Sequence, residues 1–256
     1  MSELEASFSL LKDQNVLIYV GRGVLFTLII SVIAVLLSIL FGTVLAILRN
    51  YCNSGVGKIF RAFATFYIEL FRNTPLLLWI FICVVFCPTP TFFSQKMFGL
   101  TSVESKLLWK AAVALVLFES SIIAEIIRGG LNSVAQGQFE AAYSQGFGTV
   151  KTFLLIILPQ AFRSVVPTLL GQVISTIKDS SYLANVATIE LMSRVKTILA
   201  VANRYTGQGN IHTSDVFVLF GLAAAIYFVI NFTLSCIVRS MQGRRKRAAR
   251  RDHAFA

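Results

Sequence analysis

Charged side chains occur inside stretches of this sequence that are otherwise apolar. Glu119 lies within the run 109–127, and Glu69 and Arg72 lie in the run 58–86. An ionised side chain at membrane depth costs roughly 3 kcal/mol or more unless it is paired or hydrated. Such charges could bind the ammonium and carboxylate of a zwitterionic solute in a cavity, or they could pair with one another and hold helices together.

The two interpretations carry different weight at different positions. Arg72 follows Glu69 at i, i+3, so these two could pair on one helix. Lys178 could pair with a carboxylate of a neighbouring helix. We favour pairing for these three residues and for Asp179, and leave both interpretations open for Glu119.

The run 109–127 carries further polar residues. Ser120 and Ser121 follow Glu119 directly, and Glu125 and Arg128 repeat the i, i+3 spacing at its end. We interpret that last pair as a structural hinge or anchor at the inner face of the membrane.

The residue types needed for bond chemistry do not cluster in the sequence. There is no C-x-x-C pair among the four cysteines, which we interpret as free thiols, and the two histidines are too scattered for a metal site. No phosphate-binding loop occurs, because Gly57-Lys58 lacks the upstream glycine. We therefore expect a chain that is not an enzyme and that holds no cofactor or metal.

The composition indicates an integral membrane protein. The chain has 256 residues, 56% of them apolar, with a mean hydropathy of +0.74. Residues 23–48 and 216–238 contain no charge, and each is longer than the roughly 20 residues that cross a bilayer core. Residues 1–22 show no signal-peptide pattern, so we expect the first span to be retained.

The remaining apolar runs complete an all-α fold with five transmembrane helices. We expect the five spans at 23–48, 58–86, 109–127, 162–187 and 216–238. The second is interrupted around Asn73, Thr74 and Pro75, which predicts a kinked helix that lines protein or water.

The distribution of positive charge predicts the orientation. With the C-terminus inside, thirteen Lys and Arg lie on the inner side and eight on the outer side, so we expect an outside N-terminus and a cytoplasmic C-terminus. The net charge of +11 is concentrated in the tail 239–256, which predicts a membrane-surface anchor and no nucleic-acid partner. The expected organisation is an outer segment 1–22, a transmembrane domain 23–238 and this tail.

The loop 128–162 contains the longest polar-punctuated interval on the inner side. Ala141 and Ala142 favour a short helix, Gly146 stops it, and Pro159 should prevent a helix from continuing through that point. The loop should therefore present one compact helix to the cytoplasm.

This loop resembles the cytoplasmic signature of the membrane subunits of type I ABC importers. The matching positions are Glu140, Ala141, Ala142, Gly146, Ile156, Leu158 and Pro159. The resemblance implies that the helix fits a groove on a separate ATPase and couples its motion to the membrane domain. The alternative is an ordinary surface helix between two spans.

Three further stretches resemble the branch of these permeases that takes up polar amino acids such as histidine, glutamine, glutamate and arginine. They begin at Glu69 (Glu-Leu-Phe-Arg-Asn-Thr-Pro-Leu-Leu), Ala124 (Ala-Glu-Ile-Ile-Arg-Gly-Gly) and Lys178 (Lys-Asp-Ser-Ser). Asn73, Trp79, Glu119 and Ile122 depart from the branch pattern, so the identity of the substrate stays open. The expected substrate pathway comprises Glu69, Arg72, Thr74, Trp79, Glu119, Ser120, Ser121, Lys178, Asp179 and Ser180.

The resemblance implies a permease subunit in a bacterial inner or plasma membrane. Its partners would be two ABC ATPase subunits that carry ATP and Mg, a second permease chain (identical or a sister) and an extracytoplasmic amino-acid-binding protein. The alternative is a secondary transporter or channel that works on an ion gradient, with buried carboxylates as proton sites. A membrane-embedded enzyme would need a catalytic cluster that the sequence lacks.

Overall fold

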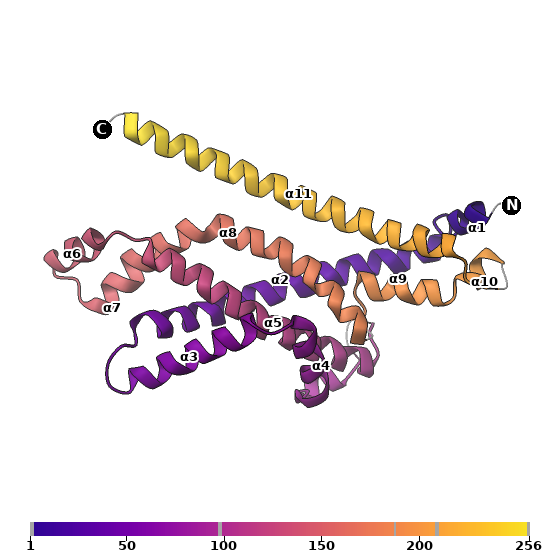
Figure 1. Ribbon diagram of the computed structural model, residues 1–256, viewed down its shortest axis with the longest axis horizontal. Helices are drawn as coiled ribbons and strands as arrows, with labels where there is room; N and C mark the ends of the chain where they lie inside the picture. The colour runs from indigo at the N-terminus through magenta and orange to yellow at the C-terminus, as the bar shows by residue number, and fades with distance from the viewer. Residues whose placement is uncertain (1–2, 97–98, 187, 208–209, 255–256) are drawn as a thin grey trace. The chain divides into compact units, whose positions relative to one another are not determined.

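A computed structural model describes residues 3–96, 99–186, 188–207 and 210–254, and the side chains of Glu3 and 244–254 lie outside that description. The regular structure of the described residues is entirely helical, as predicted (Figure 1). The predicted end of the fourth span at Ala187, and most of the predicted basic tail, fall on residues or side chains outside the described part.

The helices long and apolar enough to cross a membrane agree with the five predicted spans. In the described part, four runs pass on length and composition: α2 (Gln14–Tyr51), α5 (Ser102–Asn132), the continuous run Thr149–Val186, and Thr213–Gly243 within α11 (Thr213–Ala254). The fifth span is the pair α3 (Gly57–Arg72) and α4 (Leu76–Phe86), if the two count as one broken span. The observed helices exceed the predicted ranges because a helix ends at its capping residues and not where the hydrocarbon ends.

Shorter elements fill the connections. They are α1 (Glu3–Ser9), η1 (Thr91–Ser94), α6 (Gln136–Ser144), α7 (Thr149–Thr152), a π-helical turn η2 (Phe153–Ile157), α8 (Leu158–Asp179), η3 (Ser180–Val186), α9 (Leu191–Ala200) and α10 (Ala202–Thr206).

The second predicted span is broken and not merely kinked. Asn73 to Pro75 form the connection between α3 and α4. The Asn73 amide donates to the Glu69 carbonyl at 2.7 Å, and the Thr74 hydroxyl donates to the Leu70 carbonyl at 2.7 Å. As predicted, both polar side chains bond backbone carbonyls at the end of α3. The Glu69 carbonyl also accepts from the Asn73 N–H at 3.2 Å, so the break does not leave it free.

The prediction that Pro159 stops a helix is wrong. Helical structure runs from Thr149 through Pro159 to Val186, and Pro159 is the second residue of α8. The π-helical turn at Phe153–Ile157 lies directly before the proline. Its wider hydrogen-bonding pattern gives the chain a way to accommodate a residue without an N–H inside a helical run.

The chain forms two compact units. Unit 1 comprises 1–34, 77–115 and 174–235, and unit 2 comprises 35–76, 116–173 and 236–256. The core of unit 1 contains residues from the N-terminal segment, α2, α9, α10 and α11: Leu10, Val16, Val20, Leu191, Val195, Ile198, Ala202, Leu219 and Ala223.

Glycines allow helices of unit 2 to approach closely. A Cβ at Gly42 of α2 would lie 2.8 Å from the Ser120 carbonyl oxygen of α5. A Cβ at Gly130 of α5 would lie 2.9 Å from the Ala161 carbonyl oxygen of α8. Such contacts require a residue without a side chain, as is common where membrane helices pack.

Candidate functional site

The helix predicted in the inner loop is present as α6. Gly146 has φ +79° and follows the last turn of the helix. The Gly146 N–H donates to the Tyr143 carbonyl at 2.9 Å, and the Phe147 N–H donates to the Ala142 carbonyl at 3.1 Å. This pair of bonds is the Schellman arrangement, which ends a helix at a residue with a left-handed backbone. The prediction that Gly146 stops the helix is confirmed.

The signature residues of α6 differ in exposure. Glu140 and Ala141 are exposed, whereas Ala142 is buried, with 3% of its surface accessible. α6 packs beside α7 and η2, and the hairpin is visible in Figure 1. Tyr143 and Val150 on this hairpin are 48% and 70% exposed. A small residue and apolar side chains thus face outward on one short, well-terminated helical hairpin.

The second half of the signature lies where the hairpin joins α8. Ile156 is half-buried within the π-helical turn, and Leu158 and Pro159 begin α8. The Gln160 amide donates to the Gln138 side-chain oxygen at 3.0 Å, so the start of α8 is bonded to α6. The signature positions therefore lie on consecutive elements of one local structure.

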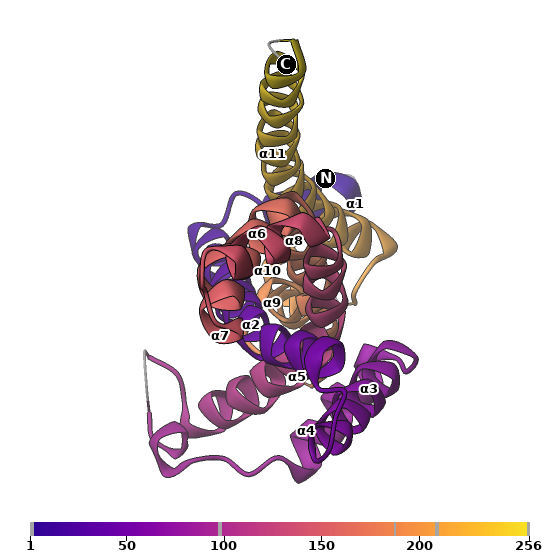
Figure 2. The same cartoon turned by 90° about the vertical axis from the view of Figure 1, so that its left-hand side faces the viewer.

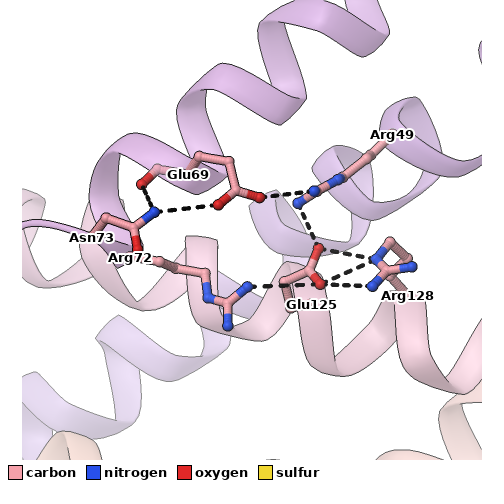
Figure 3. A network of polar contacts seen from close by, with 6 residues as sticks. All are labelled: Arg49, Glu69, Arg72, Asn73, Glu125 and Arg128. Carbon is pink, nitrogen blue, oxygen red and sulfur yellow. Dashed lines mark hydrogen bonds and ion pairs between the residues drawn. The ribbon is translucent and has the colours of Figure 1, made fainter.

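A network of charged residues joins α2, α3 and α5 within unit 2 (Figure 3). Arg49 donates from Nη1 to Glu125 Oε1 at 2.8 Å and from Nη2 to Glu69 Oε1 at 2.8 Å. Arg128 donates from Nη2 to Glu125 Oε2 at 2.8 Å, and Arg72 Nη1 lies 3.7 Å from the same oxygen. Three arginines and two carboxylates leave one excess positive charge. Each carboxylate has an arginine partner, and these contacts stabilise its ionised form.

Part of this network was predicted and part was not. The i, i+3 pairing of Glu125 with Arg128 agrees with the predicted anchor. The predicted pairing of Arg72 with Glu69 is corrected: Glu69 pairs with Arg49, and Arg72 lies nearest Glu125. Arg49 was overlooked because its partners are 20 and 76 positions away. The one available signal was an arginine at the end of an uncharged apolar run.

Glu119 is completely buried in unit 2. Its Oε2 accepts a hydrogen bond from the Gln172 amide of α8 at 2.8 Å. The hydroxyl of the next residue, Ser120, lies 3.0 Å from the Tyr67 hydroxyl of α3, and Ser121 donates to the Phe118 carbonyl at 2.6 Å. These polar groups are held between α3, α5 and α8.

The other predicted pathway residues divide between the two units. Thr74, like Glu69 and Arg72, belongs to unit 2, whereas Trp79 and Lys178 to Ser180 belong to unit 1. Ser180 is buried and donates to the Ile177 carbonyl at 2.8 Å. Lys178 is exposed, and no carboxylate of the described residues forms an ion pair with it. No group of three metal-ligating residues occurs among the described residues.

Comparison with known proteins identifies relatives that are all described as membrane components of transport systems. The family model described as "Binding-protein-dependent transport system inner membrane component" matches residues 38–247. A relative described as a probable glutamine ABC transporter permease of Bacillus subtilis (strain 168) is 35% identical, over 91% of this chain and 96% of its own length. A glutamate/aspartate import permease of Escherichia coli O6:H1 is 36% identical, over 88% and 93%.

Solved structures share the fold. An amino acid ABC transporter crystallised with histidines has a TM-score of 0.68 at 28% identity, and the match covers 88% of this chain and 94% of that one. An inward-facing methionine ABC transporter has a TM-score of 0.62 at 18% identity, covering 89% and 98%, and this second likeness concerns the fold alone.

Proposed function

The chain belongs to the family of inner membrane components of binding-protein-dependent transport systems, as a permease subunit of an ABC importer, and we propose that it imports a polar amino acid with energy from a separate ATPase. The observation that carries this proposal is α6, an exposed helix that contains Glu140, Ala141 and Ala142 of the signature and has a Schellman end at Gly146. The remaining signature positions lie on the elements that follow it. A small exposed residue such as Ala141 allows the backbone of a partner to approach closely.

The connections of α6 suggest how a movement of the ATPase subunits would be transmitted to the membrane helices. α6 begins at Gln136, shortly after α5 ends at Asn132, and the run that begins at Thr149 is helical through α8. Because both connections are short, a displacement of α6 would also move α5 and the helical run that begins at Thr149. We propose that ATP closes the ATPase pair, draws the α6 helices of two permease chains together and rocks the spans about a central cavity. Hydrolysis would reset the cycle.

The charge network would hold three of the moving helices together. Arg49 bonds α2 to both α3 and α5, so these three helices should move as one body in unit 2. Rigid-body movement needs side-chain contacts that persist while the interface rearranges. We assign the network this structural role.

The substrate class rests on the named relatives and on the buried polar groups. The relatives described above are named for glutamine and for glutamate and aspartate, and the solved structure is titled for histidines. We propose that Glu119 meets a substrate ammonium once the contact with Gln172 opens. Ser120, Ser121, Thr74, Trp79, Lys178, Asp179 and Ser180 remain proposed pathway residues.

The proposed assembly has two ATPase subunits that hold ATP and Mg. It also has a second permease chain, identical or a sister, and an extracytoplasmic amino-acid-binding protein. The proposed orientation has the N-terminus outside and α6 and the C-terminus in the cytoplasm, in accord with the positive-inside distribution of Lys and Arg.

The test is co-purification of the ATPase with variants of α6. The chain is expressed with the genes that neighbour its own and purified through a tag on the permease. Ala141→Arg places a long side chain at the proposed contact, and Ala135→Arg places it on the same loop before the helix. We expect Ala141→Arg to lose the ATPase and Ala135→Arg to retain it. Retention by both, with both correctly folded, would contradict the docking role of α6.

A further inference from the structure

A second polar site lies at the start of α5, in unit 1. A cavity of about 430 Å³ is lined by Thr89, Ser94, Val103, Lys106, Leu107 and Lys110. Its size falls within the range of roughly 300–1,000 Å³ that is typical of small-molecule sites. The lining combines two cations with two hydroxyls and contains no carboxylate.

The wall of this cavity is held in place by the end of α4. Pro88 has no N–H, so it cannot donate to the Val84 carbonyl as the next turn of a helix would. Lys110 Nζ donates to that carbonyl at 2.7 Å. The Trp109 indole N–H donates to the Pro88 carbonyl at 3.1 Å. Two adjacent residues of α5 therefore fix the connector that runs from α4 back to α5 (Figure 2), and the Lys110 ammonium retains two further donors.

Lys106 is the free cation of the cavity. It is exposed and makes no ion pair or hydrogen bond with the described residues. The neighbouring carboxylate, Glu104, accepts instead from the Thr101 N–H at 2.8 Å and the Thr101 hydroxyl at 2.9 Å, in a capping box at the start of α5. The hydroxyls of Thr89 and Ser94 also lack partners among the described residues.

Aromatic residues adjoin cavity-lining residues in the sequence: Phe93 precedes Ser94, and Trp109 precedes Lys110. Phe93 stacks on Trp109 with ring centroids 4.6 Å apart, and Phe92 packs edge-on against Phe93 at 5.3 Å. Phe92 and the cavity-lining Val103 are 62% and 63% exposed. Aromatic side chains of this kind concentrate where a membrane meets water, and long basic side chains reach the headgroup layer from the ends of spans.

We propose that this cavity binds the phosphate of an anionic phospholipid. Lys106 and Lys110 would contact the phosphate, the hydroxyls of Thr89 and Ser94 would donate to its oxygens, and the exposed apolar surface of Phe92 and Val103 would lie along the first part of the acyl chains. The apolar surface beside the cations favours a lipid over the acidic surface of a soluble protein. None of the residues that line this cavity belongs to α6 or to the proposed substrate pathway.

The test uses the fluorescence of Trp109, with Trp79→Phe as the background so that Trp109 is the single indole. The protein is placed in nanodiscs of phosphatidylcholine with increasing phosphatidylglycerol, one of the two brominated near the carbonyl so that it quenches a nearby indole. Each lysine near an anionic group should contribute about fivefold to the preference for phosphatidylglycerol. With the unaltered cavity, brominated phosphatidylglycerol should therefore quench Trp109 more strongly than brominated phosphatidylcholine does.

Two lysine variants and two competitors decide the result. Lys106→Gln should lower the preference about fivefold. The substitution should leave the fold intact, because Lys106 has no side-chain partner among the described residues. Lys96→Gln removes an exposed lysine of the same connector that does not line the cavity, and should leave the preference unchanged. Equal quenching by both lipids, or equal losses in both variants, would overturn the proposal.

Competition distinguishes the sources of phosphate. Abolition of the preference by millimolar inorganic phosphate would assign the cavity to free phosphate and overturn the lipid proposal. Unchanged lipid preference in Lys106→Gln, with weaker stimulation of the complex by its binding protein, would assign the cavity to protein contact and also overturn it.

Discussion

Arg49 lies 2.8 Å from Glu125, a residue 76 positions later in the chain, and the same guanidinium donates to Glu69. One side chain at the end of α2 thus joins three helices of unit 2. The Arg49 and Glu125 side chains are only 21% and 17% exposed, so their charges are partly shielded from water. Removal of Arg49 would leave both carboxylates with fewer positive partners.

Arg49→Gln should lower the free energy of unfolding by about 2 kcal/mol, because the hydrogen bond to the largely buried Glu125 is lost. The bond to the exposed Glu69 should contribute little to this change. The change would appear as a lower Tm of the purified protein in detergent. Lys58→Gln removes an exposed cation that has no side-chain partner among the described residues, and serves as the control. Equal Tm values for the two variants would contradict a structural role for the network.

Gly146→Ala should destabilise the end of α6 by about 1 kcal/mol, because an L-residue is strained at φ +79°. No atom lies within 4 Å of the added Cβ, so the cost comes from the backbone alone. Gly148 has φ −72° and equally open surroundings, so Gly148→Ala should be tolerated. ATPase activity of the complex and Tm are the measurements, and equal effects of both substitutions would remove the argument for a required left-handed residue.

Glu119→Gln should change uptake more than it changes the amount of folded protein. The replacement has nearly the same shape and keeps an oxygen that can accept from Gln172, while it removes the carboxylate proposed to meet a substrate ammonium. Uptake and the yield of folded protein are measured on the same preparation. A variant that loses expression but keeps its substrate affinity would refute the cavity role of Glu119.

Glu190 should make the stability of unit 1 depend on pH. It lies between the last two spans, is 1% exposed and caps α9 by accepting from the Ser193 and Met192 N–H groups. Burial raises the pKa of its carboxyl from 4.5 to about 7, although these bonds and the Tyr227 hydroxyl act in the opposite direction. Between these pH values the folded state binds more protons than the unfolded state, so stability is greatest below pH 4.5 and falls as the pH rises through about 7.

The shift corresponds to about 3 kcal/mol. Melting curves from pH 4.5 to 8 should show a falling Tm, and Glu190→Gln should flatten that part of the profile because it cannot ionise. A profile identical in the two proteins would show that Glu190 does not titrate in this range.

The sequence allowed prediction of the features that depend on nearby residues. The position of α6, its end at Gly146 and the polar bonds made by Asn73 and Thr74 all follow from local backbone chemistry. The runs 23–48 and 216–238 were equally clear, because each is uncharged and long enough to cross a bilayer core.

The features that failed depend on contacts or backbone adjustments that spacing does not reveal. Arg72 was assigned to Glu69 because both lie on one helix, but Arg49 reaches Glu69 from another helix. Pro159 was expected to stop a helix, but a π-helical turn before it allows the helix to continue. Gln172 was not singled out, because only the fold brings it to Glu119.

The most direct test of the central claim is uptake of radiolabelled polar amino acids into proteoliposomes that contain the chain with or without its ATPase and binding protein. If α6 couples ATP hydrolysis by a separate ATPase to transport, uptake will require the ATPase and ATP. Uptake will also persist when a protonophore removes the ion gradient. Uptake at the same rate by the chain alone, driven by an ion gradient and indifferent to ATP, would contradict the account.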